Sequence, residues 1–531
     1  NDSSADPTNI NTPWKNLTKI KSITPNAGDQ FLLADDSTWS YAMGDTAISA
    51  GTWNGTKNNP VIIGKYSPSG TPSAAKPIIR MGTDIQPGDW TYSAPNNAWI
   101  WSPGLGNLHD TCLILLGGEW GASNHQLVAL PLPSTNGAYK ISGASMYLYA
   151  PSGTNPTTYY GGVRVGGRNG GGLFAIGYNN KAVTFRDLHF EESGGCITVA
   201  TGTGAAHGYI IIENCSGHKV SQMINSIVYG NDTADLTIRN CTVTEWGACV
   251  IWLFDGGFRL NSFTMHNNDC RDGNYTWGQG ALYTQCGFKQ CDIYNNYISH
   301  ARYGNNGNTV DGAGLYIETG SVNVNVYNNE IAYCYIAIQD NAGNKARYHG
   351  NYIHHCKMAF AITDGLTVNL TDIAIENNTF LVGYNVLPVN GSKPGVGIYH
   401  YYAGGHVVPS EKIRNNVFVD AGETSDTTQT AILLRDSITP ASSDYTNNSV
   451  YGYTNALARY PSLTPEPTPS GTVTTNPLLD AAGHPSTGSP LIAAGKYIGY
   501  RIDGLFQQYW NKPCIGAYEY QRIRTARSLP T

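Results

Sequence analysis

The chain has 531 residues, a formal net charge of −6 and 13% charged residues. No cluster of Lys and Arg interrupts this slightly acidic composition, which argues against nucleic acid as a partner because its binding requires concentrated positive charge. No apolar run of about 18 residues occurs, so the sequence predicts no membrane span.

Residues 1–180 are predicted to form an N-terminal segment that holds the first coils and an irregular cap or insertion. Residues 1–30 are polar, whereas the stretches at 28–33 and 59–63 end in apolar residues that are typical of strands. Residues 65–180 are rich in Gly and follow no regular pattern. Three interpretations stay open for them: a cap, an inserted small β-domain, or distorted early coils.

Residues 181–455 contain a short phrase centred on Asn that recurs along the chain. Its spacing runs from 22 residues, between Asn328 and Gly350, to 38 residues, between Asn377 and Asn415. A period in this range indicates a repeat architecture in which each unit packs on its neighbours. We call the central residues of this phrase the marker residues: Asp187, Asn214, Asn240, Asn267, Asn295, Asn328, Gly350, Asn377, Asn415 and Asn447.

Short runs of β-branched and aromatic residues flank the marker residues, for example at 322–326 and 314–317. They alternate with period two and are bounded by Gly and Asn, which predicts strands. Two or three such strands per repeat form the coil of a parallel β-solenoid. Asn suits the tight turn because it tolerates the left-handed conformation, and its amide can bond to the Asn of the next coil.

The phrases Gly-Leu-Tyr-Ile at 314–317 and Asn-Asn-Glu-Ile at 328–331, with the closing stretch 512–520, resemble the right-handed parallel β-helix proteins of the pectate-lyase-like superfamily. That closing stretch usually carries Asp where this chain has Cys514. The resemblance implies an all-β fold: a single-stranded right-handed parallel β-helix, or solenoid, with an N-terminal cap region and a C-terminal extension. It implies a polysaccharide-active protein without naming the reaction, because the fold hosts lyases, hydrolases, epimerases and phage tailspikes.

Residues 456–531 are predicted to form a C-terminal extension and capping segment. Residues 456–490 are rich in Pro, Thr, Ser and Gly, and we expect them to run over the surface. The residues that follow are expected to close the open end of the solenoid, because an exposed sheet edge would pair with other chains.

The 11 cysteines fall partly on equivalent repeat positions, such as Cys215 with Cys241 and Cys334 with Cys356. We interpret these as stacked core residues, while one or two disulfides stay open as an alternative. The chain begins at Asn1 rather than Met, from which we expect a removed leader and an extracellular or particle-borne location.

Acidic and amide residues recur at the end of the second strand of each coil. Neighbouring rungs lie about 4.8 Å apart, so these side chains are expected to stack. Stacked carboxylates raise one another's pKa, which suits acid–base catalysis, and rung spacings fit the carboxyl separations of glycosidases. Turn capping or Ca²⁺ binding are the alternatives. We predict Glu318, Asp340 and Asp364 as catalytic residues, and Asp255, Gln285 and the loop residue Asp311 as substrate-binding residues.

Aromatic residues occupy one position of the same strand: Trp252, Tyr283, Tyr316 and Tyr399. The apolar neighbours of these rings, such as Leu282 and Ile317, also require the interior, which favours an outward orientation for the rings. An outward row would hold the faces of sugar rings.

A third group of side chains follows each Asn phrase by a few residues. His has the pKa for proton transfer near neutrality, and a lyase needs a base and a cation beside a uronate residue. We predict Arg271, His300 and His355 as substrate-binding residues of this group, which also includes His218, Lys219, Glu245, Asp272, Tyr333 and His354.

These patterns predict an enzyme that degrades an extracellular polysaccharide, and they favour a glycoside hydrolase with paired carboxylates. A polysaccharide lyase or uronate epimerase is the alternative, and a non-catalytic glycan-binding or tailspike-like protein is a further one. No cofactor is expected beyond the Ca²⁺ alternative. The predicted partner is a polysaccharide, and the oligomeric state stays open, with a trimer as one option.

Overall fold

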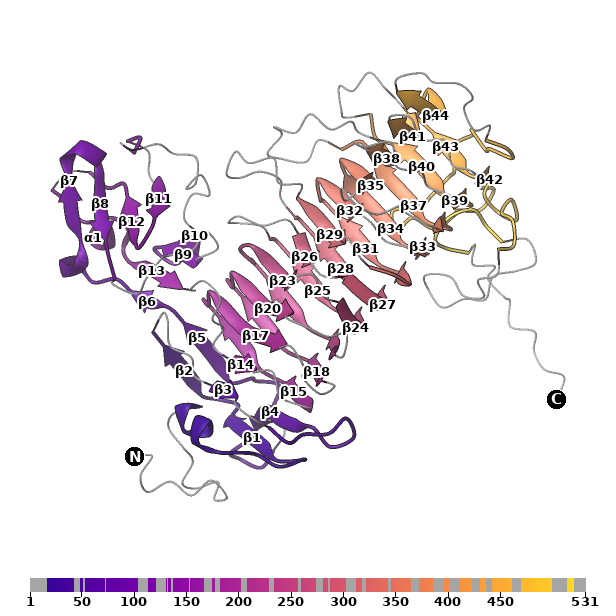
Figure 1. Cartoon of the computed structure of the whole chain (residues 1–531). Coiled ribbons are helices and arrows are strands. Elements are labelled where there is room, and N and C mark those ends of the chain that lie inside the picture. The colour runs from indigo at the N-terminus through magenta and orange to yellow at the C-terminus, as the bar shows by residue number, and fades with distance from the viewer. Residues whose placement is uncertain are drawn as a thin grey trace.

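The computed structural model is a long parallel β-helix with a small β module near its N-terminal end (Figure 1). Each coil contributes one strand to each of three sheets, which we call sheets A, B and C in chain order. The structure describes residues 17–42, 48–50, 53–71, 73–103, 113–120, 130, 132–134, 137–151, 153–166, 174–176, 182–201, 208–228, 234–255, 259–273, 280–284, 287–301, 312–317, 321–341, 345–363, 372–384, 396–401, 410–422, 430–435, 442–460, 469–498 and 513–519.

Sheet A has 12 described strands that pair in parallel, each with the equivalent strand of the next coil. Its strands are β1 (Gln30–Ala34), β4 (Val61–Tyr66), β15 (Ala182–Arg186), β18 (Gly208–Glu213), β21 (Ala234–Arg239), β24 (Arg259–His266), β27 (Gly287–Tyr294), β30 (Val324–Tyr327), β33 (Arg347–His349), β36 (Ile373–Glu376), β39 (Ser410–Arg414) and β42 (Ser442–Thr446).

Sheet B follows sheet A after the turn that carries the marker residue, and all its described strands except β34 are three or four residues long. Its strands are β2 (Thr38–Tyr41), β5 (Ile78–Met81), β16 (His189–Glu191), β19 (Ser216–His218), β22 (Thr242–Thr244), β25 (Asp269–Arg271), β28 (Tyr297–Ser299), β31 (Glu330–Ala332), β34 (Tyr352–Cys356), β37 (Thr379–Val382), β40 (Val417–Asp420) and β43 (Ser449–Tyr451).

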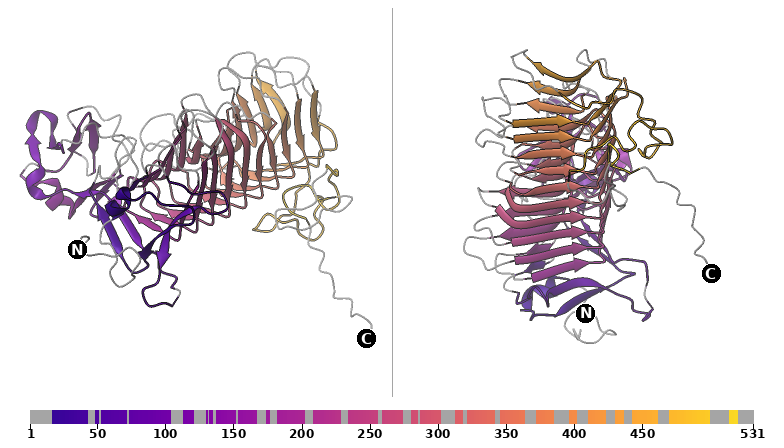
Figure 2. Two further views of the ribbon diagram at one scale, coloured as in Figure 1. Left: turned by 60° about the horizontal axis from the view of Figure 1, so that its bottom comes forward. Right: turned by 90° about the vertical axis from the view of Figure 1, so that its right-hand side faces the viewer.

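Sheet C completes each coil, and Figure 2 shows the coils stacked along one axis. Its strands are β3 (Ile48–Ala50), β14 (Phe174–Ile176), β17 (Gly195–Thr201), β20 (Gln222–Val228), β23 (Cys249–Asp255), β26 (Gly280–Thr284), β29 (Ala313–Ile317), β32 (Ile336–Asp340), β35 (Met358–Thr363), β38 (Ile398–Tyr401), β41 (Thr430–Arg435) and β44 (Asn455–Tyr460).

The sequence assigned both the left-handed turn and the amide ladder to the marker residue. In the structure, two neighbouring residues of the turn from sheet A to sheet B share these roles. The marker residue takes the left-handed conformation, with φ between 52° and 64° at all ten positions. The residue after it points inward and builds the amide ladder: Nδ2 of Asn268 donates to Oδ1 of Asn296 at 2.9 Å, and Nδ2 of Asn296 donates to Oδ1 of Asn329 at 2.9 Å. The ladder continues through Asn351, Asn378, Asn416 and Asn448.

The core fills the space between the three sheets with apolar side chains from every coil. Cys215, Cys241, Cys334 and Cys356 are fully or almost fully buried in it, and none of the four is bridged. Burial raises the pKa of the Cys215 and Cys356 thiols well above the usual value. These cysteines are therefore core-packing residues, as their repeat positions predict.

A β module is inserted between strands β5 and β14, within the stretch that the sequence left open. It consists of two four-stranded antiparallel sheets with a core of its own, and it projects from one side of the solenoid (Figure 1). Its elements are β6 (Thr83–Asp84), β7 (Thr91–Ser93), β8 (Ala98–Trp101), β9 (Leu113–Leu116), β10 (Glu119–Trp120), β11 (Tyr139–Ser142), β12 (Ser145–Leu148), β13 (Val163–Gly166), helix α1 (Pro156–Tyr160) and two 3-10 turns (Pro87–Asp89 and Ala94–Asn96). A further 3-10 helix, Leu17–Ser22, precedes the first coil.

The described part of the C-terminal extension packs against the last coils. Ser470 and Val473 form isolated bridges with Thr446 of β42 and Ser449 of β43, the terminal strands of sheets A and B. Further on, Leu491 and Ile515 pack with Val417 on the outer face of sheet B. The extension therefore covers one flank of the solenoid as well as part of its final edge.

Candidate functional site

Asp340 ends strand β32, and its side chain points into the interior of the solenoid. It aligns in register with Ile317 of β29 and Ile362 of β35, and all three residues are 0% exposed. The hydroxyl of Tyr348, from β33 of sheet A, donates a hydrogen bond of 2.6 Å to Oδ2 of Asp340. The prediction that Asp340 lines an outer groove as a catalytic carboxylate is therefore wrong, because a polysaccharide on the outer surface cannot reach it.

Most of the predicted acidic and amide ladder falls outside the described residues. The backbone of Asp255 is described at the end of β23, but its side chain is not. Four predicted residues lie outside the described ranges: Glu318, Asp364, Gln285 and Asp311. Their catalytic or binding roles stay predictions.

The aromatic column of sheet C points outward, as predicted, but it is buried. Trp252, Tyr283 and Tyr316 pack in a cluster separate from the solenoid core, while the alternating residues Leu282 and Leu315 face that core. The ring centroids of Tyr283 and Tyr316 lie 4.9 Å apart, and the two residues are only 4% and 8% exposed. The column is thus a second apolar layer on the outer face of sheet C, and it offers little open ring surface to a sugar.

A different column of side chains lies where the coils pass from sheet B to sheet C. Seven successive coils place a non-glycine residue in the left-handed conformation there, with φ between 46° and 56°. We call these residues the turn column: Glu192, Lys219, Glu245, Asp272, His300, Tyr333 and His355.

Four of the seven turn-column residues are of types that the left-handed region disfavours: Glu192, Lys219, Glu245 and Tyr333. Gly and Asn occupy the left-handed region at the lowest cost, and eight of the ten marker residues on the other turn are Asn. A left-handed Tyr, Lys or Glu costs about 1 kcal/mol or more, and such residues cluster at functional sites. The next coil returns to glycine, at Gly383 with φ 84°. The turn column therefore carries side chains that the fold alone does not require.

Histidine and tyrosine side chains stack at one end of the turn column. The ring centroids of Tyr333 lie 4.6 Å from His300 and 4.8 Å from His355, and His355 lies 4.5 Å from Tyr384. Tyr333 is 37% exposed, so this stack reaches the surface. We call the stacked residues and their neighbours on β34 the His–Tyr cluster: His300, Tyr333, Tyr352, His354, His355 and Tyr384.

A hydrogen-bonded relay orients His355. Nε2 of His354 lies 3.1 Å from Oε1 of Glu330, and Nδ1 of His354 lies 2.7 Å from Nδ1 of His355. Because a carboxylate only accepts, His354 donates through Nε2, and its Nδ1 accepts from Nδ1 of His355 when both rings are neutral. The lone pair of His355 then resides on Nε2. A carboxylate–histidine pair of this kind fixes the tautomer and stabilises positive charge on the relay.

His300 is oriented in a similar way. Its Nδ1 lies 3.4 Å from Oδ1 of Asp272, the preceding member of the turn column, and 3.1 Å from Oγ of Ser299. His300, beside the Asp272 carboxylate, and His355, linked to Glu330 through His354, therefore flank Tyr333, and both have the chemistry of general acids and bases.

Arg271 places positive charge on the same face, two strands of sheet B before Tyr333. Its side chain is about half exposed, and the guanidinium lies 4.6 Å from the ring centroid of Tyr297 on the next strand. A hydrogen bond to Asp269, at 2.6 Å, raises the pKa of Arg271, so the group stays charged. Of the predicted binding residues, Arg271, His300 and His355 thus come together on one face.

The C-terminal extension forms a wall beside this face. His484 Nδ1 lies 3.0 Å from Asp480 Oδ2, and the His484 ring contacts Tyr518, which in turn contacts Tyr352. Although burial raises the pKa of Asp480, its hydrogen bonds from the backbone and side chain of His484 lower it overall. Burial and nearby carboxylates, led by Glu330, raise the pKa of Tyr352.

Several of these residues were not among the predicted binding and catalytic residues. Tyr333 and His354 belonged to the wider group, whereas Glu330, Tyr352 and His484 were not considered. The signal for Tyr333 and His354 is their constant distance after the marker residue. His484 lies in the C-terminal extension, and nothing in the coil period places it beside β34.

No three His, Cys, Asp or Glu side chains of the described ranges converge where they could hold a metal ion. Nor do the described helices include one that is long and apolar enough to cross a membrane.

Comparisons with known proteins agree with this architecture. Residues 225–407 match the family described as "Right handed beta helix region". The solved structure "The complex structure of XylC with xylose" superposes with a TM-score of 0.55 at 11% identity, covering 97% of this chain and 96% of that one. The tailspike gp61 of Pseudomonas phage phi297 gives a TM-score of 0.18 at 11% identity, over 83% and 71% of the two chains, which is too low to support an argument. No curated protein matched the chain. The fold is therefore a right-handed parallel β-helix.

Proposed function

We propose that this protein cleaves an acidic polysaccharide by β-elimination at the His–Tyr cluster. The observation that carries the proposal is the stack of His300, Tyr333 and His355, held in left-handed turns that would otherwise favour Gly or Asn. Imidazole and phenol groups are those that an elimination needs near neutral pH. The XylC likeness, at 11% identity, supports the fold and leaves the substrate to experiment.

The chemistry assigns one role to each side chain. In β-elimination a base removes the proton from C5 of a uronate residue, and the electron pair forms the C4–C5 double bond as the C4–O glycosidic bond breaks. Nε2 of His355 accepts that proton, because the Glu330–His354 relay leaves its lone pair there. The hydroxyl of Tyr333 gives a proton to the departing oxygen. Arg271 attracts uronate carboxylates of the chain to the same face.

The turn column suggests how the glycan is oriented on the solenoid. Its members recur once per coil, about 4.8 Å apart, along the axis of the solenoid. An extended glycan that lies parallel to this axis would contact several of them in turn. A polymer of this kind is met outside the cell, so the proposal includes an extracellular or particle-borne location and requires no cofactor.

Hydrolysis by carboxylates remains the second candidate, and one observation favours it. Glu245 and Asp272 occupy neighbouring rungs of the turn column, and the rung spacing of about 4.8 Å is close to the ~5–5.5 Å carboxyl separation of retaining glycosidases. Glu245 lies 3.7 Å from Lys219, and Asp272 lies 3.4 Å from His300, so each carboxylate has a basic neighbour.

One assay separates these candidates. Alginate, polygalacturonate, hyaluronan and xylan are incubated with the protein while reducing ends and ultraviolet absorbance of unsaturated products are measured together. We expect both signals to rise on an acidic polymer and to fall about 10²–10⁴-fold in Tyr333→Phe and in His355→Gln. Tyr451→Phe is the matched control, because Tyr451 is 38% exposed and lies outside the cluster.

The other outcomes are equally definite. Reducing ends without absorbance, lost in Glu245→Gln or Asp272→Asn, would replace elimination with hydrolysis. Binding of a polymer without either signal, unchanged in all four variants, would make the protein a glycan-binding or tailspike-like protein and would refute the catalytic assignment.

A further inference from the structure

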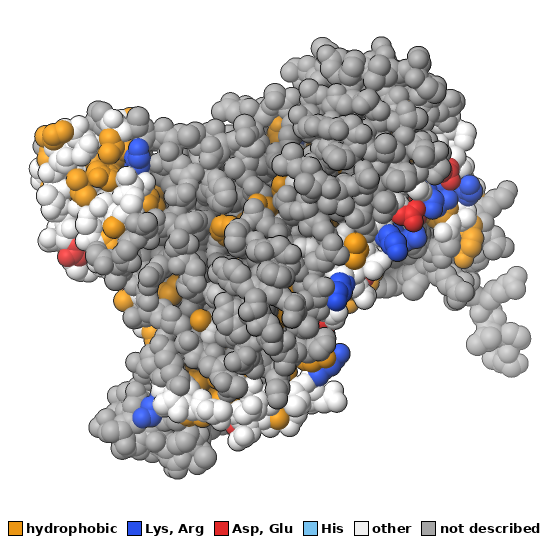
Figure 3. Space-filling model, viewed as in Figure 1, with side chains coloured by type: hydrophobic (Ala, Val, Ile, Leu, Met, Phe, Trp, Pro, Cys, Tyr) orange, Lys and Arg blue, Asp and Glu red, His pale blue; other side chains and the backbone are white. Residues whose placement is uncertain are grey.

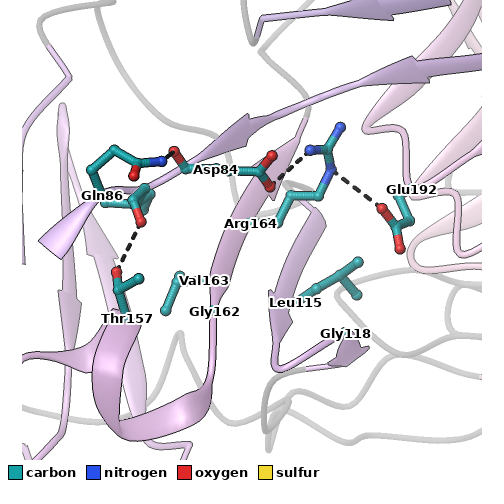
Figure 4. Close-up of a pocket in the computed structure, with 10 residues that line it drawn as sticks. Asp84, Gln86, Leu115, Gly118, Thr157, Gly162, Val163, Arg164 and Glu192 are labelled. Carbon is teal, nitrogen blue, oxygen red and sulfur yellow. Dashed lines mark hydrogen bonds and ion pairs between the residues drawn. The ribbon is translucent and has the colours of Figure 1, made fainter.

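A pocket lies at the junction between the inserted module and the solenoid. Its volume is about 310 Å³, which is in the lower part of the range for small-ligand sites. Residues of the module line most of it, and Glu192, which follows strand β16 of the solenoid, completes one side (Figure 4). We call it the junction pocket.

Its polar wall is a guanidinium between two carboxylates. Nη1 of Arg164 donates to Oδ1 of Asp84 at 2.8 Å, whereas Nε of Arg164 lies 3.6 Å from Oε2 of Glu192, beyond hydrogen-bond reach. That Nε is buried and makes no hydrogen bond in the described structure. A buried donor without an acceptor costs about 1–3 kcal/mol. Figure 4 shows the guanidinium between the two acidic side chains.

The rest of the pocket combines apolar surface with a few polar groups. Ile85, Leu115 and Val163 supply the apolar surface, and the exposed Gln86 brings an amide to the rim. The hydroxyl of Thr157 is already committed, because it accepts from Trp90 Nε1 and donates to the carbonyl of Ile85. An apolar floor with carboxylate, amide and guanidinium groups suits a sugar, whose C–H faces and hydroxyls are arranged in the same way.

The net charge of the junction pocket favours neutral sugars over anionic ones. One guanidinium faces two carboxylates, so the three ionisable groups sum to −1. An anionic sugar would be repelled by Asp84 and Glu192, while a neutral sugar can donate hydroxyl hydrogen bonds to both.

The junction pocket is continuous with the turn column. Glu192 is the first member of that column, and the second, Lys219, touches the module: its Nζ donates to the carbonyl of Gly118 at 2.7 Å and lies 3.2 Å from Oε1 of Glu119. From Glu192 to Tyr333 the column rises five strands of sheet B, or about 24 Å. A short oligosaccharide spans that distance.

We propose that the junction pocket binds a neutral sugar unit of the glycan whose acidic unit reacts at the His–Tyr cluster. This inference rests on the proposed function and deepens it: the substrate is a mixed polysaccharide with both neutral and acidic residues. The inserted module thereby fixes how far from the bound unit the chain is cut.

The test measures sugar binding separately from cleavage. Xylose, galactose, glucose and galacturonate are mixed singly with the full chain, and saturation-transfer NMR detects which of them bind. We expect one or more of the neutral sugars to bind, and any galacturonate signal, which the Arg271 face would also give, to be unchanged by substitutions in the pocket. Asp84→Asn and Gln86→Ala, both at exposed positions, should reduce the neutral-sugar signal several-fold, whereas Asp36→Asn, an exposed carboxylate of the first coil, should leave it unchanged.

Each result has one meaning. If no neutral sugar binds, if the pocket variants weaken galacturonate as much as the neutral sugars, or if the variants bind like the wild type, the pocket assignment is overturned, even where the polysaccharide is still cleaved at Tyr333. If the variants lose sugar binding while no polymer is cleaved, the pocket stands and the proposed reaction fails. If the variants lose sugar binding and the wild type cleaves a polymer, Asp84→Asn should also change the sizes of the products from a mixed polymer.

Discussion

Among individual residues, a partly buried aromatic ladder on the outer face of sheet A is a clear source of pH dependence. His266, Tyr294, Tyr327 and His349 stack from strand to strand with ring centroids 4.8, 4.9 and 5.1 Å apart. Burial, reinforced by the charge of Arg347, lowers the pKa of His349 from 6.5 to about 3. His349 is therefore neutral in the folded protein over a range where the unfolded chain would be protonated.

The sign of this effect follows from proton counts. Between pH 6.5 and about 3 the unfolded state binds a proton at His349 that the folded state does not, so the free energy of unfolding falls as pH falls through this window. Above pH 6.5 the contribution is complete and constant. We predict that His349→Phe, which keeps the ring stack, flattens the decline of the urea midpoint between pH 7 and 4. An equal slope in wild type and variant would show that His349 is accessible to protons in the folded state.

Within a single strand, the case of Asp340 shows what the sequence could not decide. Strand β32 is buried at all five positions, because sheet C packs the core on one face and the cluster of Tyr283 and Tyr316 on the other. A strand covered on both faces loses the alternation from which side-chain direction is inferred. A shift of one residue then reverses every assignment. For this reason the sequence did not reveal that the Asp340 side chain points into the core.

The regular coils were predictable because their signal is repeated. The Asn phrase marks the same turn in each coil, and the ladder from Asn268 to Asn448 ties the coils together there. The inserted module offers no such repetition: its sheets pair β13 with β6 and β9 across long stretches of chain. Part of the His–Tyr cluster was predictable from the sequence, because His300 and His355 recur at a fixed position of the coil. The wall formed by the C-terminal extension was not predictable, because it lies outside the coil repeat.

At the scale of the turn, the left-handed column makes a prediction about stability. Replacing Glu245, with φ 51°, by glycine removes the steric cost of a Cβ in that conformation. The ion pair that is lost, at 3.7 Å from Lys219, is partly exposed and weak. We expect Glu245→Gly to unfold at an equal or higher urea concentration, with a gain of up to about 1 kcal/mol. Glu245→Ala is the control, because alanine keeps the Cβ and the strain.

A clear loss of stability in Glu245→Gly, beyond that of Glu245→Ala, would mean that the side chain is kept for the fold. The turn column would then lose its standing as a functional surface. If Glu245→Gly is equally or more stable but binds glycan more weakly, the protein carries Glu245 for function at a cost in stability.

In the whole molecule, the proposed function draws on three segments: the inserted module, the coils and the C-terminal extension. The module meets the turn column at Glu192, the coils supply the His–Tyr cluster, and the extension adds Asp480 and His484. Figure 3 shows basic and acidic side chains along the margin over the later strands of sheet A. A repeat scaffold makes such a division natural, because each coil is stabilised by its neighbours alone.

The C-terminal extension also protects the end of the solenoid. Ser470 and Val473 pair with the terminal strands β42 and β43, and Leu491 is 0% exposed against Val417. A chain ending at Tyr460 would expose these strand edges and apolar side chains, and open edges recruit further strands. We predict that this truncated protein self-associates, as measured by light scattering during gel filtration. Leu491→Asp keeps the full length but buries a charge at the same contact, so it should associate as well. A truncated protein with the same molar mass and melting temperature as the full chain would show that the coils close their own end, and the extension would then serve only the wall beside Tyr352.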